Sequence, residues 1–194
     1  MDLILGYVQN MWLYMMITTP FIIVFRLYKM KSTHSTVNIL HEIGVIFFFI
    51  FLLGLLSQTI IPNVSIKEGA LFFENGNYQA TNFEFFRVLI ETHNAIKYLN
   101  YWQPFFINFI GNIVMFIPIG FLLPLLWRKF QNGFVTIGLG FLISLSIEIL
   151  QLPQMRSSDV DDLWLNTLGT GVGYVIFLFI PQKILPRFKF KGDG

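Results

Sequence analysis

The stretch GVIFFFIFLLGLL (Gly44–Leu56) contains no polar side chain, and it decides the class of this protein. Extended to its natural limits at His41 and Pro62, it can cross about 30 Å of hydrocarbon as a helix rising about 1.5 Å per residue. Four other stretches have the same character and lack the alternation of membrane β-strands. The five predicted membrane-spanning helices are Leu3–Leu27, His41–Pro62, Phe105–Trp127, Gly133–Leu152 and Leu163–Pro181.

The composition of the whole chain agrees with this prediction. Of its 194 residues 55% are hydrophobic and only 12% are charged, and the mean hydropathy is +0.64. Soluble domains carry roughly 25% charged residues, so a soluble enzyme and a disordered chain are both excluded. The net charge of +2, without a basic stripe, argues against a nucleic-acid partner, and the absence of cysteine excludes thiol chemistry. We therefore predict an all-α, polytopic helical membrane protein forming a single membrane domain over residues 1–194.

The distribution of lysine and arginine predicts the orientation. Nine of the 13 basic residues fall before the second helix, between the third and fourth helices, or after the fifth helix. The positive-inside rule then places the N-terminus outside and the C-terminus inside, with the first helix retained because no cleavable signal pattern follows it. These nine residues are Arg26, Lys29, Lys31, Arg128, Lys129, Lys183, Arg187, Lys189 and Lys191.

The long connection at about 63–104 is extracytoplasmic in this topology. Within it, Asn75-Gly76 is a dipeptide that favours a β-hairpin turn. Further along, apolar residues recur at helical spacing from Phe86 to Lys97, which predicts a short amphipathic helix on the outer face of the membrane. Tyr98, Tyr101 and Trp102 then predict an interfacial aromatic belt.

Polar residues inside three of the predicted helices form stripes at helical spacing. Ionisable groups within a membrane are costly and are candidates for function. In the predicted orientation all three stripes lie at the outer ends of their helices, so we expect one polar pocket that opens outward between the third, fourth and fifth helices. Its candidate ligand-binding residues are Asn108, Asn112, Glu148, Gln151, Arg156, Asp159, Asp162 and Asn166.

These residue types suit several chemistries. Arg156 matches a phosphate or carboxylate through its planar guanidinium. Glu148, Asp159 and Asp162 could hold a divalent cation, and no other cofactor is expected. Glu148 and Asp162 are also candidates for a catalytic acid and base.

Structural roles remain open beside these chemistries. Asp159 and Asp161 suit the start of a helix, and the asparagines could join neighbouring helices. Glu148 and Arg156 could form an ion pair. Gly169 and Gly173 form a small-xxx-small step that allows close helix packing.

Three linked motifs make the chain resemble the VanZ-like family of bacterial membrane proteins. They are GNIVMFIPIGFLLP (Gly111–Pro124), SLSIEILQ (Ser144–Gln151) and RSSDVDDLWLNTLGTGVGY (Arg156–Tyr174). The resemblance covers about residues 82–180, and a weaker similarity at Asn82–Arg87 has Phe85 where the family commonly has proline.

The resemblance implies a multi-pass protein of the bacterial plasma membrane with a role in resistance to teicoplanin and related lipoglycopeptides. The partner would be an outer-leaflet lipid, a lipid-linked cell-wall precursor or the glycopeptide itself, and a homodimer remains open. Two classes of function compete. One is a binding protein, and the other is a membrane-embedded enzyme that modifies such a lipid by carboxylate acid–base chemistry.

Overall fold

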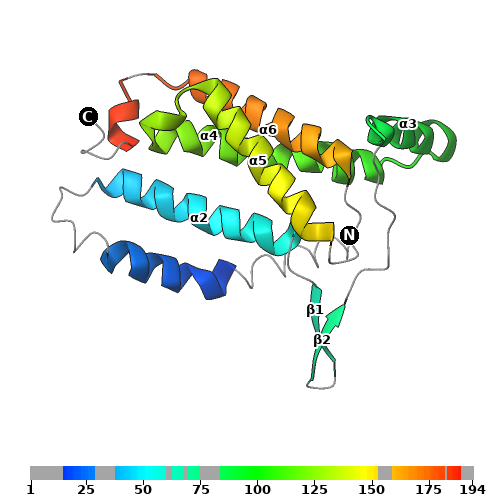
Figure 1. Cartoon of the computed structure of the whole chain (residues 1–194), viewed down its shortest axis with the longest axis horizontal. Coiled ribbons are helices and arrows are strands. Elements are labelled where there is room, and N and C mark those ends of the chain that lie inside the picture. Colours follow the sequence, from blue (N-terminus) through cyan, green and yellow to red (C-terminus); the bar gives the residue numbers. More distant parts are fainter. Residues whose placement is uncertain are drawn as a thin grey trace.

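The computed structural model describes residues 15–28, 38–59, 63–67, 70–74, 84–152, 159–181 and 183–188. Its main body is a bundle of long helices that run along one axis, with a β-hairpin and a short helix at one end (Figure 1). The elements are the helix Met15–Tyr28, α2 (Ile39–Thr59), β1 (Asn63–Lys67), β2 (Ala70–Glu74), α3 (Arg87–Leu99), the π-helical turn Phe105–Ile110, α4 (Gly111–Leu126), the 3-10 turn Arg128–Phe130, α5 (Gly133–Gln151), α6 (Val160–Leu178) and the 3-10 turn Leu185–Phe188.

Three of these helices are long and apolar enough to cross a membrane, namely Ile39–Ser57, Phe105–Leu126 and Gly133–Gln151. This confirms the predicted class of helical membrane protein. The fifth predicted span corresponds to α6, which begins at Val160 rather than Leu163. The earlier start follows from Asp159, whose side chain accepts the N–H of Asp161 and so caps the helix.

The α4 and α6 helices make the most extensive contact in the bundle. Their backbones touch, because a Cβ atom built on Gly169 or Gly173 would collide with the carbonyl oxygen of Ile113 or Ile117. The small-xxx-small step therefore serves helix packing, as predicted. Since α4 and α6 run in parallel from the same end of the bundle, this contact also brings their first turns together.

The other end of the bundle holds a cluster of buried polar contacts. Arg26 forms a two-bond ion pair with Glu42 of α2, with Nε–Oε2 and Nη2–Oε1 distances of 2.8 and 2.7 Å. Beside it, Nδ1 of the buried His41 lies 2.7 Å from the carbonyl oxygen of Phe188, and the His41 ring packs edge-on against Trp127. These contacts attach the helix Met15–Tyr28 and the C-terminal 3-10 turn to α2.

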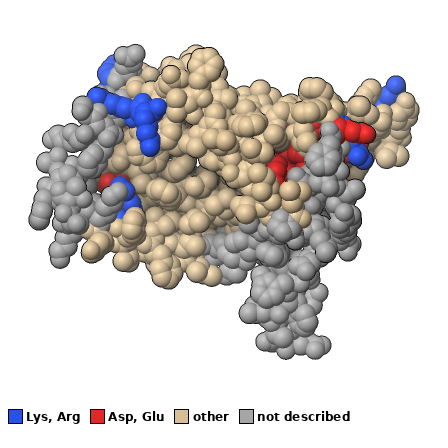
Figure 2. Space-filling model, viewed as in Figure 1, with Lys and Arg blue, Asp and Glu red and all other residues tan. Residues whose placement is uncertain are grey.

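The charged residues gather at the two ends of the bundle. Figure 2 shows one group of lysine and arginine where α4 ends and α5 begins, and most of the aspartate and glutamate at the opposite end, where α6 begins and where further basic atoms lie beside them. The exposed Arg128, Lys129 and Lys183 belong to the first group. Asp159 and Asp162 belong to the α6 turn at the other end.

The connection before α3 contains a β-hairpin. The β1 and β2 strands pair antiparallel with Lys67 opposite Ala70, so the hairpin closes between these two residues. The predicted turn dipeptide, Asn75-Gly76, comes after β2 and lies outside the described residues. The predicted amphipathic helix is present as α3.

Candidate functional site

The first turn of α6 is the point at which four helices meet. It contains three aspartates, and each is bonded toward a different part of the protein. Asp159 connects α6 with α5, Asp161 with α3, and Asp162 with α4. The site is therefore built by residues that are far apart in the sequence.

The contact with α5 runs through Glu148. Its Oε2 atom accepts the backbone N–H of Asp159 at 3.0 Å, and only 7% of its surface is exposed. The Asp159 side chain in turn accepts the N–H of Asp161 at 2.9 Å. The predicted role of Asp159 as a helix cap is thus confirmed, and the buried Glu148 carboxylate lies directly beside it.

The contact with α4 is a hydrogen bond between side chains. Nδ2 of Asn112 donates to Oδ1 of Asp162. Glu148 and Asp159 lie close enough to Asp162 for Coulombic repulsion between their carboxylates, so three acidic groups are concentrated at the start of α6. Such a group of charges at the end of an apolar bundle favours a cationic partner or a shared proton.

One turn further along α6, Asn166 faces α5. Its Nδ2 donates to Oγ of Ser144 at 2.9 Å, and both side chains are buried. Among the described residues the buried Oδ1 of Asn166 has no hydrogen-bond partner. A buried acceptor without a partner is costly, so this oxygen suits a donor supplied by a bound molecule.

Two predicted site residues lie differently from the prediction. Gln151 donates from Nε2 to the carbonyl oxygen of Thr59 at 2.9 Å and so joins the ends of α5 and α2. Asn108 belongs to the π-helical turn, in which the spacing of an α-helix does not hold. No hydrogen bond joins Asn108 to the site within the described ranges.

Arg156, the predicted anion-binding residue, lies outside the described residues. A cluster of three or more acidic or histidine side chains that could hold a metal ion is not found in the described part of the chain. In the described structure the carboxylates of Glu148, Asp159 and Asp162 each accept a hydrogen bond from a protein N–H group.

Sequence reasoning missed Asp161, whose side chain accepts three hydrogen bonds at the site. Asp161 is completely buried, and its Oδ1 accepts the N–H of Phe86 at 2.6 Å and Nε1–H of Trp164 at 2.7 Å. Its Oδ2 accepts the N–H of Val88 at 2.6 Å. Two of these donors are backbone groups at the start of α3, and a backbone donor leaves no signal in the sequence.

Chemically, this end of the bundle combines carboxylates, amides and an unpaired buried oxygen. It can accept hydrogen bonds from a polar headgroup, and Glu148 and Asp162 could exchange a proton with a bound molecule. Among the described residues it contains no serine, histidine or cysteine arranged as a nucleophile with a base.

Comparisons with known proteins agree with this architecture. Neither curated proteins nor solved structures gave a match. A family model described as VanZ/LLP1 matches residues 45–181, beginning within α2, well ahead of the motifs that carry the resemblance in the sequence. The match covers well over half of the chain and includes α3 and all three helices of the site, and the chain therefore belongs to the VanZ/LLP1 family.

Proposed function

We propose that this protein resides in the bacterial plasma membrane with five spans, the N-terminus outside and the C-terminus inside. There it binds the headgroup of an outer-leaflet lipid, a cell-wall precursor or a glycopeptide at the start of α6. The orientation is supported by the exposed Arg128, Lys129 and Lys183, which lie at the end of the bundle opposite the site. The family membership supports a role in teicoplanin resistance.

The observation that carries the proposal is the meeting of Asn112, Glu148 and Asp162, from three different helices, at one end of an apolar bundle. Polar and ionisable groups within a membrane cost free energy, so their presence at this end of the bundle favours a functional role. In the proposed complex Arg156 binds the anionic part of the headgroup, and Glu148 and Asp162 orient Arg156. The Oδ1 atom of Asn166 accepts a hydroxyl or amide N–H of the ligand.

The test is antibiotic susceptibility of a sensitive Gram-positive host that expresses the protein. We expect protection against teicoplanin that exceeds protection against vancomycin. Arg156→Ala should abolish this protection at equal membrane levels and Glu148→Gln should reduce it, whereas Glu91→Gln, the same change on the exposed face of α3, should retain it. Equal susceptibility with and without the wild-type protein would reject the proposed role in resistance.

A second candidate function is a membrane-embedded enzyme that modifies the same ligand. It is favoured by the mutual repulsion of Glu148 and Asp162, because paired carboxylates can divide the roles of acid and base. An enzyme predicts that Glu148→Gln and Asp162→Asn both abolish function while ligand binding is kept. A binding protein predicts that Asp162→Asn retains part of its function and that Arg156→Ala is the most severe change.

The proposed orientation has a separate test, which benefits from the absence of cysteine in the native sequence. A cysteine introduced by Asn75→Cys should react with a membrane-impermeant maleimide in intact cells. A cysteine introduced by Lys189→Cys should react only after the membrane is permeabilised. The reverse pattern would overturn the orientation.

A further inference from the structure

The start of α3 is held by a single carboxylate of α6. The Asp161 side chain satisfies the N–H groups of Phe86 and Val88, which have no partner within α3 because they belong to its first turn. A negative charge is also favourable at this end of a helix. Trp164 completes the arrangement by donating from its indole to the same carboxylate.

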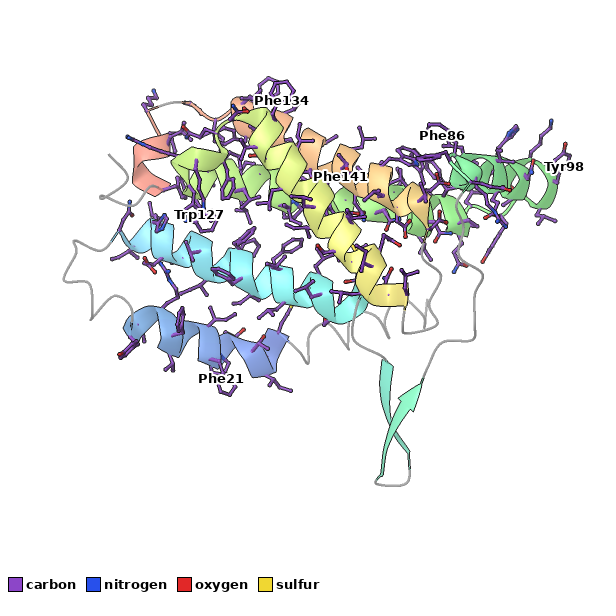
Figure 3. All side chains as sticks on the ribbon, in the orientation of Figure 1. Phe21, Phe86, Tyr98, Trp127, Phe134 and Phe141 are labelled. Carbon is purple, nitrogen blue, oxygen red and sulfur yellow. The ribbon has the colours of Figure 1, made fainter. Side chains whose placement is uncertain are left out.

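Aromatic rings cover this contact. The ring of Phe86 packs on Trp164 with centroids 5.5 Å apart, and Phe109 lies 6.2 Å from Trp164 on another side. Figure 3 shows Phe86 where α3 meets α6, with Tyr98 at the far end of α3. The backbone of Phe86 adopts a left-handed conformation with φ of 65°, which is rare for a bulky residue and requires support from its surroundings.

Beyond this attachment, α3 has one face that nothing in the described structure covers. Leu89 and Ile90 are 42% and 62% exposed, and with His93 and Asn94 they line a shallow hollow on the helix. The opposite side packs inward through the buried Val88. A short helix with an exposed apolar face, at the end of a membrane bundle, suits the boundary between headgroups and acyl chains.

The segment that follows α3 connects it directly with a membrane-spanning helix. Past α3 the exposed Tyr101 and Trp102 lead directly into the apolar segment Phe105–Leu126, which is long enough to span the bilayer. The aromatic pair suits the interface, since tyrosine and tryptophan prefer that depth. The occupant of the exposed face of α3 is therefore the lipid of the outer leaflet.

We infer that Asp161 is a positioning residue that docks this interfacial helix on the first turn of α6, so that the seating of α3 in the outer leaflet fixes the geometry of the proposed site. The inference rests on the proposed function, because it concerns the same site. Asp161 lies between Asp159 and Asp162 in one helical turn and donates its own N–H to Asp159. A displacement of α3 is thereby passed to both neighbouring carboxylates.

The substitution Asp161→Asn tests this inference with little change of volume. Three N–H donors converge on the two carboxylate oxygens, whereas an asparagine side chain offers one oxygen and one NH₂ group. At least one donor must then face an NH₂ group, so α3 should detach. Trp164→Phe is a milder variant that removes one donor and keeps an aromatic ring, in case Asp161→Asn does not fold.

Spin-label distances can report the docking directly in lipid nanodiscs of phosphatidylglycerol and phosphatidylethanolamine. Nitroxides are attached after Glu91→Cys on the exposed side of α3 and Leu178→Cys at the exposed far end of α6. The wild-type background should give one narrow distance distribution. Asp161→Asn should lose it, Trp164→Phe should broaden it, and Glu84→Gln, an exposed carboxylate near α3, should keep it.

A second measurement separates positioning from general stability. With membrane level and melting temperature matched to wild type, the variant that detaches α3 should also lose protection against teicoplanin. A narrow distribution in both Asp161→Asn and Trp164→Phe overturns the docking. A broad distribution with full protection overturns the link to the site. If the wild-type protein itself gives no protection, the proposed function has failed, and the distance distributions still decide the docking.

Discussion

The contact between the backbones of α4 and α6 makes a sharp prediction at Gly173. A Cβ atom there would collide with the carbonyl oxygen of Ile117 and would lie 2.9 Å from its carbonyl carbon and 3.0 Å from the backbone nitrogen of Phe121. All three are backbone atoms, so no side-chain rotation can relieve the contact and the helices must separate. Overpacking of this kind costs about 1–3 kcal/mol.

The same helix supplies the matched control. Gly171 lies two residues away, and the nearest atom to a Cβ built on it is Cδ1 of Ile137 at 4.0 Å, an ordinary contact. Both substitutions gain the helix propensity of alanine over glycine, about 1 kcal/mol. The difference between Gly173→Ala and Gly171→Ala therefore isolates the steric cost.

The assay is thermal unfolding of the two purified variants in the same detergent. Gly173→Ala should have a free energy of unfolding about 1–3 kcal/mol lower than Gly171→Ala. At about 2–4 °C of Tm per kcal/mol for a chain of this size, the two variants should differ by at least about 2 °C. Equal melting temperatures would refute the close approach of α4 and α6.

Two further predictions concern stability elsewhere in the bundle. Glu42→Gln breaks the buried pair with Arg26, whose side chains are only 10% and 15% exposed, and should lower the free energy of unfolding by up to about 3 kcal/mol. Glu91→Gln breaks an exposed pair with Arg87 and should leave the melting temperature nearly unchanged, so equal losses in the two variants would contradict the reasoning. Asn132→Ala removes the side-chain acceptor for the N–H of Phe134 at the start of α5 and should cost about 1 kcal/mol, whereas Asn132→Gly should cost only a few tenths, measured by the same thermal assay.

The helices of this protein could be predicted because membrane helices must satisfy their own backbone hydrogen bonds over about 20 apolar residues. That requirement determines the composition of the helices, so the ends of α2 and α5 fall within three residues of the ends of the predicted stretches. The packing of α4 on α6 was predictable for a related reason. Close approach of two helices needs small side chains, and the spacing of Gly169 and Gly173 can be recognised in the sequence.

Other features of the structure have no recognisable pattern in the sequence. The π-helical turn that contains Asn108 has no residue pattern of its own. The β1–β2 hairpin closes between Lys67 and Ala70, where the sequence had not indicated a turn. Burial of His41 depends on the carbonyl oxygen of Phe188, which lies 147 positions away in the chain.

The three aspartates at the start of α6 show why the site was only half visible. A pattern of acids at helical spacing draws attention to Asp159 and Asp162, because they share a stripe with Asn166. Asp161 falls off that stripe and suggested only a favourable charge in a first turn. However, because Asp161 lies on a different side of the helix from that stripe, its carboxylate faces α3, whereas the carboxylate of Asp162 faces α4. A helix that must join neighbours on several sides therefore needs polar residues at consecutive positions, and a single stripe at helical spacing leaves out those that face another side.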